Sequence, residues 1–321
     1  MLTSAIEPEV ARDDRPPYRP FRVRVRQIRE LSPHFRRVTF TGPDLDLFGR
    51  DGLDQRIKLL LPLPDSPVAD LGADGDWYAR WLALPEGRRN PLRTYTVRAV
   101  RPDARELDVD FVIHPDHGPN GHVDGPAARW LAGARAGSEL VIVGPDARSI
   151  HSASGIDWRP GAATCFLLAG DETAVPGIAG ILASLDDRHR VTVFVEVPGA
   201  ADAHELPTLA RADVHWLARD GRERGALLQE AVSTWIADNP GIVRAAAAAA
   251  VQPLEDVDVD TELLWDSPAE TDDADGEFHA WLAGEAAVIK ALRWLLVTGA
   301  GIDRKRVAFM GYWRHGRAEQ N

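Results

Sequence analysis

The sequence predicts two domains of different class, a six-stranded antiparallel β-barrel followed by an α/β domain built on a parallel sheet. Three observations support this prediction. The length of 321 residues suits about two domains. Apolar residues in the first half recur with the period of β-strands, whereas the second half alternates strand-like and helix-like segments. We expect a flexible arm over residues 1–20, a barrel domain over 21–150 and an α/β domain over 151–321.

The composition excludes several classes of protein. Hydrophobic residues make up 45% and charged residues 27%, which is typical of globular chains and excludes general disorder. The net charge of −12 argues against a nucleic-acid binder that relies on phosphate contacts. The single cysteine, Cys165, excludes an internal disulfide framework and any metal site with several cysteines. No apolar stretch approaches the roughly 20 residues that span a bilayer, and the start lacks a secretory signal, so we expect a cytoplasmic protein without membrane insertion.

The barrel is predicted from six short strand-like runs. In residues 21–28, Phe21, Val23 and Val25 alternate with arginines, which indicates a strand with one face in water. Turn-forming Pro, Gly and Asp separate this run from the others. The other strands are expected at 36–41, 56–61, 93–100, 106–113 and 138–144. A single helix is expected at 126–134, and the set favours a small closed antiparallel barrel.

The α/β domain is predicted from alternating elements after about Ala163. Alternation of strands and helices predicts a parallel sheet covered on both faces. The strands are expected at 164–170, 191–197, 212–218, 277–284 and 306–313, and the helices at 173–185, 226–238 and 285–297. An alanine-rich and acidic insertion at about 245–277 is expected to be solvated, with a merely structural or disordered role.

Several nucleotide and hydrolase motifs are missing from the sequence. It contains no GxGxxG after a strand, no GxxxxGK[ST], no HExxH and no GxSxG. A phosphate-binding P-loop and a serine nucleophile elbow therefore have no direct support. A dinucleotide can still bind an α/β domain without the fingerprint, because ligands lie at the carboxyl ends of parallel strands.

The segment Arg93-Thr94-Tyr95-Thr96-Val97-Arg98 is the most informative motif of the barrel. Arg93 and Tyr95 share one face of a strand, so both can contact one ligand. An arginine offers a fixed fork to a pyrophosphate, and a tyrosine offers a flat ring to an aromatic cofactor. Thr96 would reach the same ligand from the strand edge or through its backbone. An alternating strand without a ligand shows the same pattern.

A second motif marks the start of the barrel helix. Gly125 permits a tight turn and Pro126 suits the first helical position. The N–H groups of Ala127 and Ala128 would then point at an anion, aided by the helix dipole. An ordinary helix start has the same sequence.

Two further turns follow strands of the α/β domain. Asp171, Glu172 and Thr173 come after the first strand, where a nucleotide is expected to bind. Gly284 and Glu285 occupy the corresponding place after a later strand. Acidic side chains repel phosphate, so we expect them to hold ribose hydroxyls or a helix N-terminus.

These segments, followed by Gly311-Tyr312-Trp313-Arg314-His315-Gly316, resemble the siderophore-interacting proteins. These are FAD-dependent ferric-siderophore reductases, related to the vibriobactin-utilization proteins and to the ferredoxin reductase superfamily. The resemblance runs from about Arg22 to Arg317. The RxYT motif occurs in many flavin reductases, but its combination with GPAxxW, GDET, WxAGE and GYWR is specific to this group. The resemblance implies an N-terminal FAD-binding barrel and a C-terminal NAD(P)H-binding-like domain.

The resemblance also implies which residues contact the cofactor. Arg93 should hold the FAD pyrophosphate, Tyr95 should pack against the flavin, and Thr96 should lie near its N5 edge. Ala128 stands where many relatives have serine, so one hydroxyl contact is missing. The other implied cofactor-binding residues are Val97, His114, Gly125, Ala127, Trp130, Asp171, Glu172, Thr173, Gly284, Glu285, Tyr312 and Trp313. No catalytic side chain is expected, because the flavin performs the electron transfer.

A trianionic ferric siderophore requires basic residues near the flavin. By resemblance these are Lys58 on a barrel strand and Arg314 of the GYWR motif, with Arg148 as a further equivalent after the last barrel strand. Each cation close to the substrate is worth on the order of 1 kcal/mol where partly solvated. Solvated surface residues are the alternative interpretation of all three.

The loop His114-Pro115-Asp116-His117-Gly118-Pro119-Asn120-Gly121-His122 suggests a rival site. Three imidazoles and a carboxylate suit zinc or iron in principle. The loop has two prolines and no second element to fix the ligand geometry, so a polar loop beside FAD is the better interpretation. We expect no metal site.

The sequence thus predicts an FAD-dependent oxidoreductase that reduces ferric siderophores and releases Fe(II) in the cytoplasm. A flavin reductase of another electron-transfer system and a non-catalytic siderophore-binding protein remain alternatives. NADH, NADPH and reduced ferredoxin are all candidate electron donors. Glu196 ends the second parallel strand, where an acid favours NADH by holding ribose hydroxyls. Arg219, Arg222 and Arg224 could instead receive the 2′-phosphate of NADPH.

Overall fold

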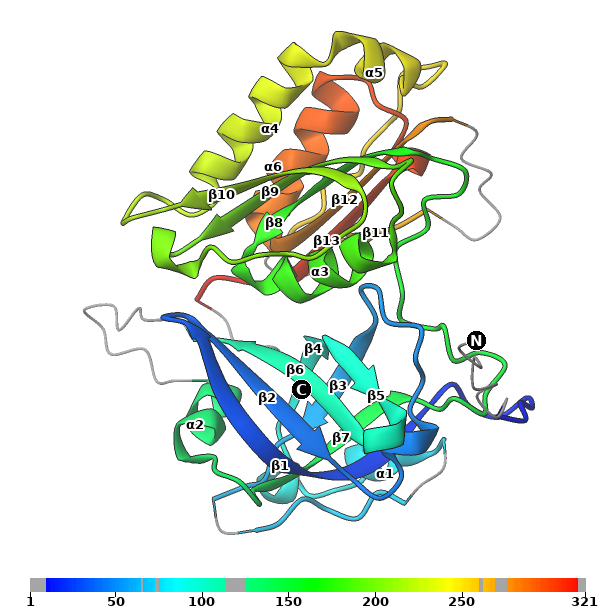
Figure 1. The fold of residues 1–321 in the computed structure, drawn as a ribbon, viewed down its shortest axis with the longest axis vertical. Helices are drawn as coiled ribbons and strands as arrows, with labels where there is room; N and C mark the ends of the chain where they lie inside the picture. The colour runs from blue at the N-terminus through cyan, green and yellow to red at the C-terminus, as the bar shows by residue number, and fades with distance from the viewer. Residues whose placement is uncertain are drawn as a thin grey trace, which may run out of the picture. The chain divides into compact units, whose positions relative to one another are not determined.

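A computed structural model describes residues 10–64, 66–72, 75–113, 125–259, 262–268 and 276–316. Its contacts form two compact units, which Figure 1 shows as ribbons. The first unit holds most of the residues up to Gly155. The second begins at Ile156 and also includes the hairpin tip Arg29–Arg37 and the end of the strand that precedes His114. The expected boundary at 150/151 therefore lies before the division at Gly155/Ile156. The first strand already begins at Tyr18, inside the expected arm.

The first unit is one sheet of seven strands in the order β4-β3-β7-β1-β2-β6-β5. β3 pairs antiparallel with β4 and β7, β7 with β1, and β6 with β5. The strands are β1 (Tyr18–Ser32), β2 (Phe35–Thr41), β3 (Arg56–Leu60), β4 (Leu92–Thr96), β5 (Ala99–Arg101), β6 (Glu106–Val112) and β7 (Glu139–Pro145). The prediction of an antiparallel N-terminal sheet is confirmed.

The prediction of six strands is wrong, because the expected strand over 93–100 divides at Val97 and Arg98. The Val97 N–H donates to the carbonyl of Gln55 next to β3, at 2.9 Å. The following N–H, of Arg98, donates to the carbonyl of Asp108 on β6, at 3.0 Å. The chain thus changes partners within two residues. Since β4 and β5 form opposite edges of the sheet, this short link requires the sheet to curl until its edges meet.

Alternation along β1 gives the barrel its interior. Phe21, Val23 and Val25 are buried, whereas Arg22 and Arg24 between them are exposed. The expected helix over 126–134 is α2 (Pro126–Gly133). A second helix, α1 (Trp77–Leu82), has no counterpart in the sequence prediction. Its Trp81 packs in an apolar cluster that includes Leu60, Leu92, Val141 and Val143.

The second unit contains a six-stranded sheet in the order β10-β9-β8-β12-β13-β11. Its strands are β8 (Cys165–Asp171), β9 (Arg190–Val197), β10 (Arg211–Ala218), β11 (Trp265–Asp266), β12 (Phe278–Glu285) and β13 (Val307–Trp313). Its helices are α3 (Val175–Ser184), α4 (Ala226–Asp238), α5 (Pro240–Ala245) and α6 (Ala286–Arg293). A 3-10 turn at Glu172–Ala174 leads from β8 into α3.

The purely parallel sheet predicted for this unit is not found, because β11 runs antiparallel to β13. The other five strands are parallel, as expected. β11 comes from the acidic insertion, which was expected to be solvated. Leu264 is buried and its carbonyl accepts a bond from the Gly311 N–H at 2.8 Å. Asp266 forms an ion pair of 2.8 Å with Arg293, so this part of the insertion belongs to the sheet.

Helices cover both faces of the second sheet. Figure 1 shows α4 and α6 on one face and α3 on the other. Apolar residues of β8 and β12 pack against Leu228, Val232 and Trp235 of α4 and against Ile289 and Leu292 of α6. The carboxyl ends of the parallel strands lie at one edge of the sheet, and the turns into α3, α4 and α6 lie at this edge as well. In the described part of the chain, none of the helices is long and apolar enough to cross a bilayer.

Candidate functional site

Arg93 and Tyr95 lie on one face of β4, as the sequence predicts. Pairing with β3 places Arg93 opposite Leu59 and Tyr95 opposite Ile57. Both side chains are half-buried, and Arg93 Nη1 donates to the carbonyl of Leu92 at 2.7 Å. The guanidinium and the ring therefore stand one strand period apart, which suits a ligand with a phosphate and an aromatic part.

Thr96 and Val97 stand where the chain leaves β4. Both are buried, with 6% and 2% of their surface exposed. The N–H of Val97 is already used by Gln55, so this backbone donor is committed to the barrel. His114 and the other histidines of the loop 114–122 lie outside the described residues. Among the residues that the structure describes, no group of three or more His, Cys, Asp or Glu side chains could hold a metal ion.

The start of α2 leaves backbone donors without a side-chain partner. Gly125 is the N-cap, Pro126 follows as the first helical residue, and the first turn contains no acidic residue. No side chain in the described part of the chain caps this helix. A Cβ placed on Gly125 would meet no atom within 4 Å, so the backbone here is open. N–H groups at a helix start, here those of Ala127 and Ala128, suit an anion.

Trp130 of α2 contacts an aromatic ring of β2. Its ring stacks on Phe40 with the centroids 6.1 Å apart. It also lines a cavity of about 1140 Å³, together with Pro126, Arg129 and residues of β1 and β7. Of the predicted FAD residues in the described part of the barrel unit, Trp130 is the only one that lines this cavity. The cavity is therefore distinct from the surface that Arg93 and Tyr95 present.

Lys58 lies on the other face of the sheet from Arg93 and Tyr95. Its register partner on β4 is Thr94, and its Nζ donates to the Thr94 hydroxyl at 2.5 Å. Directly opposed residues of an antiparallel pair share a face, and neighbouring residues of one strand do not. The predicted substrate-binding lysine and the predicted FAD residues of β4 thus face opposite ways.

The two predicted substrate-binding arginines have partners of their own. Arg148 forms two hydrogen bonds with Asp146, of 2.9 and 2.7 Å, and the charge of Arg148 is balanced by this buried carboxylate. Burial acts to raise the pKa of Asp146, but its bonds from Arg148 prevail and hold this pKa below its ordinary value. Arg314, in the second unit, donates to the backbone carbonyl of Glu262.

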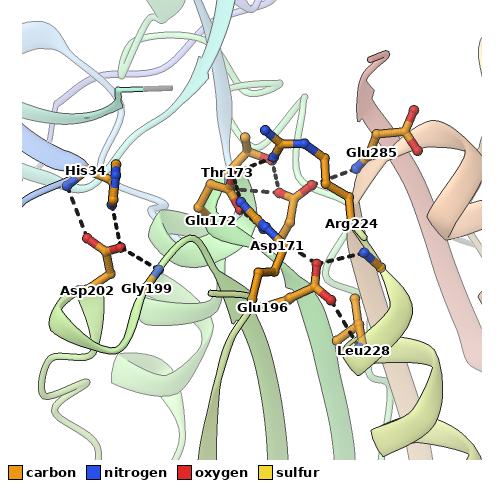
Figure 2. A network of polar contacts seen from close by, with 12 residues as sticks. His34, Asp171, Glu172, Thr173, Glu196, Gly199, Asp202, Arg224, Leu228 and Glu285 are labelled. Atoms are coloured by element: carbon orange, nitrogen blue, oxygen red, sulfur yellow. Dashed lines mark hydrogen bonds and ion pairs between the residues drawn. The ribbon is translucent and has the colours of Figure 1, made fainter. Parts of the chain in front are cut away.

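Asp171 lies at the carboxyl end of β8 and has both carboxylate oxygens occupied (Figure 2). The N–H and the hydroxyl of Thr173 donate to Oδ1 at 2.9 and 2.5 Å. The Glu285 N–H and Trp313 Nε1 donate to Oδ2 at 2.7 and 2.8 Å. Gly284 makes room for this arrangement, since a Cβ there would lie 2.7 Å from Asp171 Oδ2. The structure therefore joins Asp171, Thr173, Glu285 and Trp313 in one cluster.

The buried position of Asp171 changes the pKa of its carboxyl group. Burial, followed by the nearby charge of Glu172, raises the pKa of Asp171 from its ordinary 3.8 to about 6. The bonds from Thr173 and Trp313 act in the opposite direction but do not offset burial.

Glu172 is fully buried and binds two arginines. Arg219 donates to both of its carboxylate oxygens, at 2.7 and 2.9 Å, which is the bidentate geometry of a strong ion pair. Arg224 adds a bond of 3.2 Å to the same carboxylate. Of the three arginines proposed as receptors for a 2′-phosphate, Arg219 and Arg224 are therefore engaged with the chain itself. Arg222 is exposed and lies 3.7 Å from a carboxylate oxygen of Glu230.

Glu196, at the end of β9, is bound to the start of α4. Its Oε2 accepts the Gly225 N–H at 2.7 Å, and its Oε1 accepts the Leu228 N–H at 3.3 Å (Figure 2). Arg219 Nη1 lies 3.5 Å from Oε2. With 1% of its surface exposed, Glu196 caps a helix and does not present itself to a ribose.

Glu285 plays the same part at α6. It is the N-cap, and its Oε2 accepts the N–H groups of Ala287 and Val288 at 2.8 and 3.0 Å. Its Oε1 receives the His315 N–H at 3.3 Å. Glu285 is 9% exposed, so both oxygens serve the fold of this unit.

Trp313 and Tyr312 differ in their surroundings. Trp313 is half-buried, and the Arg224 guanidinium lies 5.3 Å from the centre of its ring. Tyr312 stacks on Trp265 of β11 and meets Trp281 edge to face. Tyr312 therefore packs within the sheet, whereas Trp313 is held at the carboxyl edge by Asp171 and Arg224.

Two family models and one relative decide the family of this chain. Residues 24–149 match the siderophore-interacting FAD-binding domain, and residues 163–316 match the siderophore-interacting protein model. An uncharacterized protein of Mycobacterium tuberculosis is 33% identical over 295 residues, which covers 91% of this chain and 89% of that protein. The chain belongs to the siderophore-interacting protein family. The resemblance inferred from the motifs is confirmed.

Other members of the siderophore-interacting family and its relatives cover nearly the same length. A ferric vibriobactin reductase of Vibrio cholerae is 29% identical over 293 residues, or 90% of this chain and 88% of that protein. The crystal structure of the siderophore-interacting protein SipS from Aeromonas hydrophila covers 94% of each chain, with 26% identity and a TM-score of 0.64. The two-domain architecture predicted from the sequence is shared with that structure.

In this siderophore-interacting protein, sequence reasoning missed one polar cluster. Asp202, after β9, is fully buried and accepts bonds from the Ser32 hydroxyl and from His34 Nδ1, both of 2.6 Å. It also accepts the Gly199 N–H at 3.2 Å (Figure 2). These contacts hold the hairpin tip of the second unit. Neither His34 nor Asp202 stands in a motif, and the two are 168 residues apart, so the sequence carries no local signal of their contact.

Proposed function

We propose that the chain binds FAD in its barrel unit, reduces the Fe(III) of ferric siderophores and releases Fe(II) in the cytoplasm. The observation that carries this proposal is the open start of α2, where small residues and uncapped N–H groups leave a place for a pyrophosphate. It lies within the residues that match the siderophore-interacting FAD-binding domain. The name of the V. cholerae relative, a ferric vibriobactin reductase, supports the substrate class.

The barrel residues fit FAD in chemistry. The N–H groups of Ala127 and Ala128 would receive the pyrophosphate, and the Arg93 guanidinium would add a charged fork. The Tyr95 ring, half-buried on the same face as Arg93, would pack against the flavin. Thr96 and Val97 would border it where the chain leaves β4. When bound, FAD supplies a carrier that takes up two electrons and gives them to iron one at a time.

The substrate would be held by charge. A tris-catecholate complex of Fe(III) is a trianion, and Lys58 and Arg314 are the cations proposed to attract it. Arg148 contributes less to this field, because Asp146 balances its charge. One-electron reduction gives Fe(II), which hard oxygen ligands hold less tightly than Fe(III), so the metal leaves the chelator. No side chain of the protein needs to act as an acid or base.

The proposal is tested without any choice of electron donor. The purified protein is loaded with FAD, reduced anaerobically by light and a sacrificial amine, and mixed with ferric siderophores. We expect reoxidation of the flavin band and one Fe(II) trapped by a ferrous chelator for each electron lost. A protein that binds no FAD, or whose reduced FAD leaves the siderophore iron oxidised, contradicts the proposal.

Arg93 supplies a matched pair of variants. Arg93→Gln should weaken FAD binding about 10-fold to 100-fold, because hydrogen bonds to a charged group are worth about 1.5–3 kcal/mol. Arg135→Gln removes an exposed arginine that follows α2 and should leave FAD affinity unchanged. Equal effects of the two variants would show that the loss is one of net charge alone.

Two other functions predict other results once a carrier protein and the Lys58→Ala variant are added to this experiment. A flavin reductase of another electron-transfer system would pass electrons rapidly to a carrier protein and be indifferent to Lys58→Ala. A non-catalytic siderophore-binding protein would bind the ferric complex but yield no trapped Fe(II).

A further inference from the structure

The cavity beside α2 measures about 1140 Å³ and takes no part in the proposed function. One wall is a single face of the helix, whose residues recur at helical spacing, namely Pro126, Arg129, Trp130, Gly133 and Ala134. A Cβ on Gly133 would meet no atom within 4 Å, so the helix leaves open space on this side. Sites for small molecules have volumes of roughly 300–1,000 Å³, so this cavity is large enough to hold one.

Arginines give the cavity a positive charge. Among the described residues that line it, Glu139 is the only acid, and four are arginines, namely Arg22, Arg24, Arg105 and Arg129. We call it the arginine cavity. This local surplus of positive charge contrasts with the net charge of −12 of the whole chain. Arg22 and Arg24 project from the same face of β1, because the buried Val23 between them points the other way. A guanidinium group binds a phosphate or a carboxylate through two parallel hydrogen bonds.

The ion pairs of these arginines are of a kind that a ligand can replace. Arg22 Nη2 lies 3.3 Å from Asp70 Oδ1, and both side chains are more than half exposed. Arg105 Nη2 lies 3.4 Å from Asp46 Oδ2, and both side chains are exposed as well. Exposed ion pairs contribute little to stability, so an anion that takes the place of either carboxylate does so at little cost.

Much of the remaining wall is apolar. Leu63 and Val68 line it, together with five prolines outside the helix, namely Pro43, Pro62, Pro64, Pro67 and Pro91. Prolines have no N–H group and a fixed φ, so they form a stiff wall without hydrogen-bond donors. The Trp130 ring stacks on Phe40 at an interplanar angle of 23°, so one of its faces is already covered. These walls therefore suit a hydrocarbon chain better than a stacked base.

We propose that the arginine cavity binds an anionic amphiphile, with a phosphate head group at Arg22 and Arg24 and a hydrocarbon chain along Leu63 and the prolines. Membrane phospholipids and soluble phosphate esters both carry this chemistry. A phospholipid bound in this way would hold the barrel unit at a membrane surface, where each arginine near anionic lipids adds to the attraction.

The inference does not rest on the proposed function. Arg93, Tyr95, Ala127 and Ala128 carry the proposed FAD contacts, and none of these four residues lines the arginine cavity. The two sites should therefore be filled independently of each other.

The test measures the binding of dihexanoyl phosphatidic acid, a phospholipid short enough to stay monomeric in water. Calorimetry is done on the protein with FAD and without it. We expect one site, the same Kd in both forms, and binding at least tenfold tighter than that of inorganic pyrophosphate, because pyrophosphate offers the charge without the chain. Absence of binding, or equal affinity for pyrophosphate, overturns the inference. Displacement of FAD by the lipid also overturns it, because the cavity would then belong to the cofactor.

Vesicles distinguish the two sources of the ligand. The protein is sedimented with vesicles of phosphatidylcholine alone and with vesicles of equal parts phosphatidylcholine and phosphatidylglycerol. Cosedimentation with the anionic vesicles only supports the inference and identifies a membrane phospholipid as the ligand. Binding of dihexanoyl phosphatidic acid without cosedimentation supports it as well and identifies a soluble phosphate ester.

Two neighbouring arginines of β1 supply a matched pair of variants. Arg24→Gln should weaken the binding of the lipid about tenfold, because it removes hydrogen bonds to a charged head group. Arg26→Gln removes the same charge from an exposed position on the same face of β1, but Arg26 does not line the cavity. We expect its affinity to stay within about twofold of the original, because exposed charges at a distance are screened by salt. Equal losses in the two variants would overturn the assignment of the head group, since net charge alone would explain them.

Leu63→Ala tests the hydrocarbon wall separately. It should weaken the binding of dihexanoyl phosphatidic acid about fivefold, because apolar contact area is lost. It should leave the affinity for pyrophosphate unchanged, and thermal melting checks that the variant is folded. A folded variant that binds the lipid as tightly as the original overturns the assignment of the chain to this wall.

Discussion

The starts of α2 and α6 are the same structural feature with opposite outcomes. Each helix has eight residues and begins near a turn that the sequence marks with glycine. Gly125 leaves the first N–H groups of α2 without a side-chain partner in the described residues. Glu285 satisfies those of α6 with its own carboxylate. A helix start receives an external anion only where the chain leaves its donors open, and one residue at the N-cap decides this.

The comparison separates the two units by function. The barrel unit offers uncapped donors and a half-buried Arg93 and Tyr95, which suit a phosphate and a ring. In the α/β unit, Glu196 and Glu285 accept the N–H groups at the starts of α4 and α6, and Asp171 accepts one from the turn before α3. Fold class alone predicts nucleotide binding at both places. The capping residues predict it at one.

Closing the open helix should give the largest effect. Gly125→Asp places a carboxylate at the N-cap, where it would accept the N–H groups that we assign to the FAD pyrophosphate. Loss of two hydrogen bonds to a charged group should weaken FAD binding about a thousandfold, or about 4 kcal/mol. FAD titrations followed by flavin fluorescence measure the change in affinity. Thermal melting should show that the variant protein is no less stable.

Gly125→Ala is the matched control for this change. The φ of Gly125 is −58°, and a Cβ there meets no atom within 4 Å, so alanine fits without strain. Its FAD affinity should stay within a few-fold of the original. Unchanged affinity in both variants would show that the pyrophosphate lies elsewhere.

His279 differs from both helix starts, because its polar ring is buried and has no hydrogen-bond partner among the described residues. It lies on β12 with 0% of its surface exposed, and neither ring nitrogen has a hydrogen-bond partner among the described residues. Burial lowers its pKa from the ordinary 6.5 to about 3. The unfolded chain therefore binds a proton that the folded chain refuses. The stability that His279 contributes is complete above pH 6.5 and is lost as the pH falls toward 3.

Replacing this imidazole should protect the fold against acid. His279→Phe keeps a ring against Trp158, whose centroid is 5.3 Å away, and removes the titrating group. Between about pH 7 and pH 4 the variant should lose about 3 kcal/mol less free energy of unfolding than the original chain loses. Urea unfolding at several pH values measures the gain. His215→Gln, at an exposed position on β10, should give no such shift, and an equal response would refute the assignment.

Features that depend on residues close together in the chain can be predicted from the sequence, and features that depend on distant partners cannot. The strand alternation at Phe21, Val23 and Val25 and the Gly-Pro helix start at Gly125 depend on neighbours in the chain, and both were predicted correctly. The break of one strand at Val97 was not, because the partner changes from β3 to β6 only when the sheet curls. No residue within 93–100 signals that change.

The candidate site shows the same limit. The acids after β8 and β12 were recognised as unsuited to phosphate, and a helix N-terminus was one of their expected partners. What the sequence could not show is that Asp171 also binds Trp313, 142 residues away, or that Glu196 caps α4. Such pairings arise because parallel strands end at one edge of a sheet. They are invisible until the strand order is known.

Asp171 gives a test of the comparison in the second unit, at the carboxyl end of β8. Its folded pKa of about 6 lies above the ordinary 3.8, so the folded chain binds the proton more tightly. The stability contributed by this protonation is complete below pH 3.8 and is lost as the pH rises through 6. Asp171→Asn should remove this dependence, which amounts to about 2 kcal/mol between about pH 4 and 7.

The measurement is best made in a chain that already carries His279→Phe, because the two groups act in opposite directions over the same pH range. Urea unfolding of the single and double variants then isolates Asp171. An amide also weakens the acceptor for Trp313 Nε1, so its indole proton resonance should shift upfield. A slope against pH that is unchanged by Asp171→Asn would show that this carboxylate is charged throughout the range.

The smallest expected effect contrasts two cations of the barrel unit. Lys58 bonds to the Thr94 hydroxyl, whereas Arg148 is paired with the buried carboxylate of Asp146. Lys58→Met should raise KM for a trianionic ferric siderophore about fivefold, or about 1 kcal/mol, since one solvated charge at about 4 Å is worth that much. It should leave FAD affinity unchanged, because Lys58 faces away from Arg93 and Tyr95.

Arg148→Met should have a smaller effect on KM than Lys58→Met, because Arg148 is already paired with Asp146 within the chain. A charge that the chain already satisfies does little for a ligand, so KM should change less than twofold. Removing the arginine leaves Asp146 buried without its ion pair from Arg148, so stability should fall. Steady-state kinetics at several salt concentrations, together with urea unfolding, separate the two effects. A larger KM change for Arg148→Met than for Lys58→Met would mean that the ion pair opens when the siderophore binds.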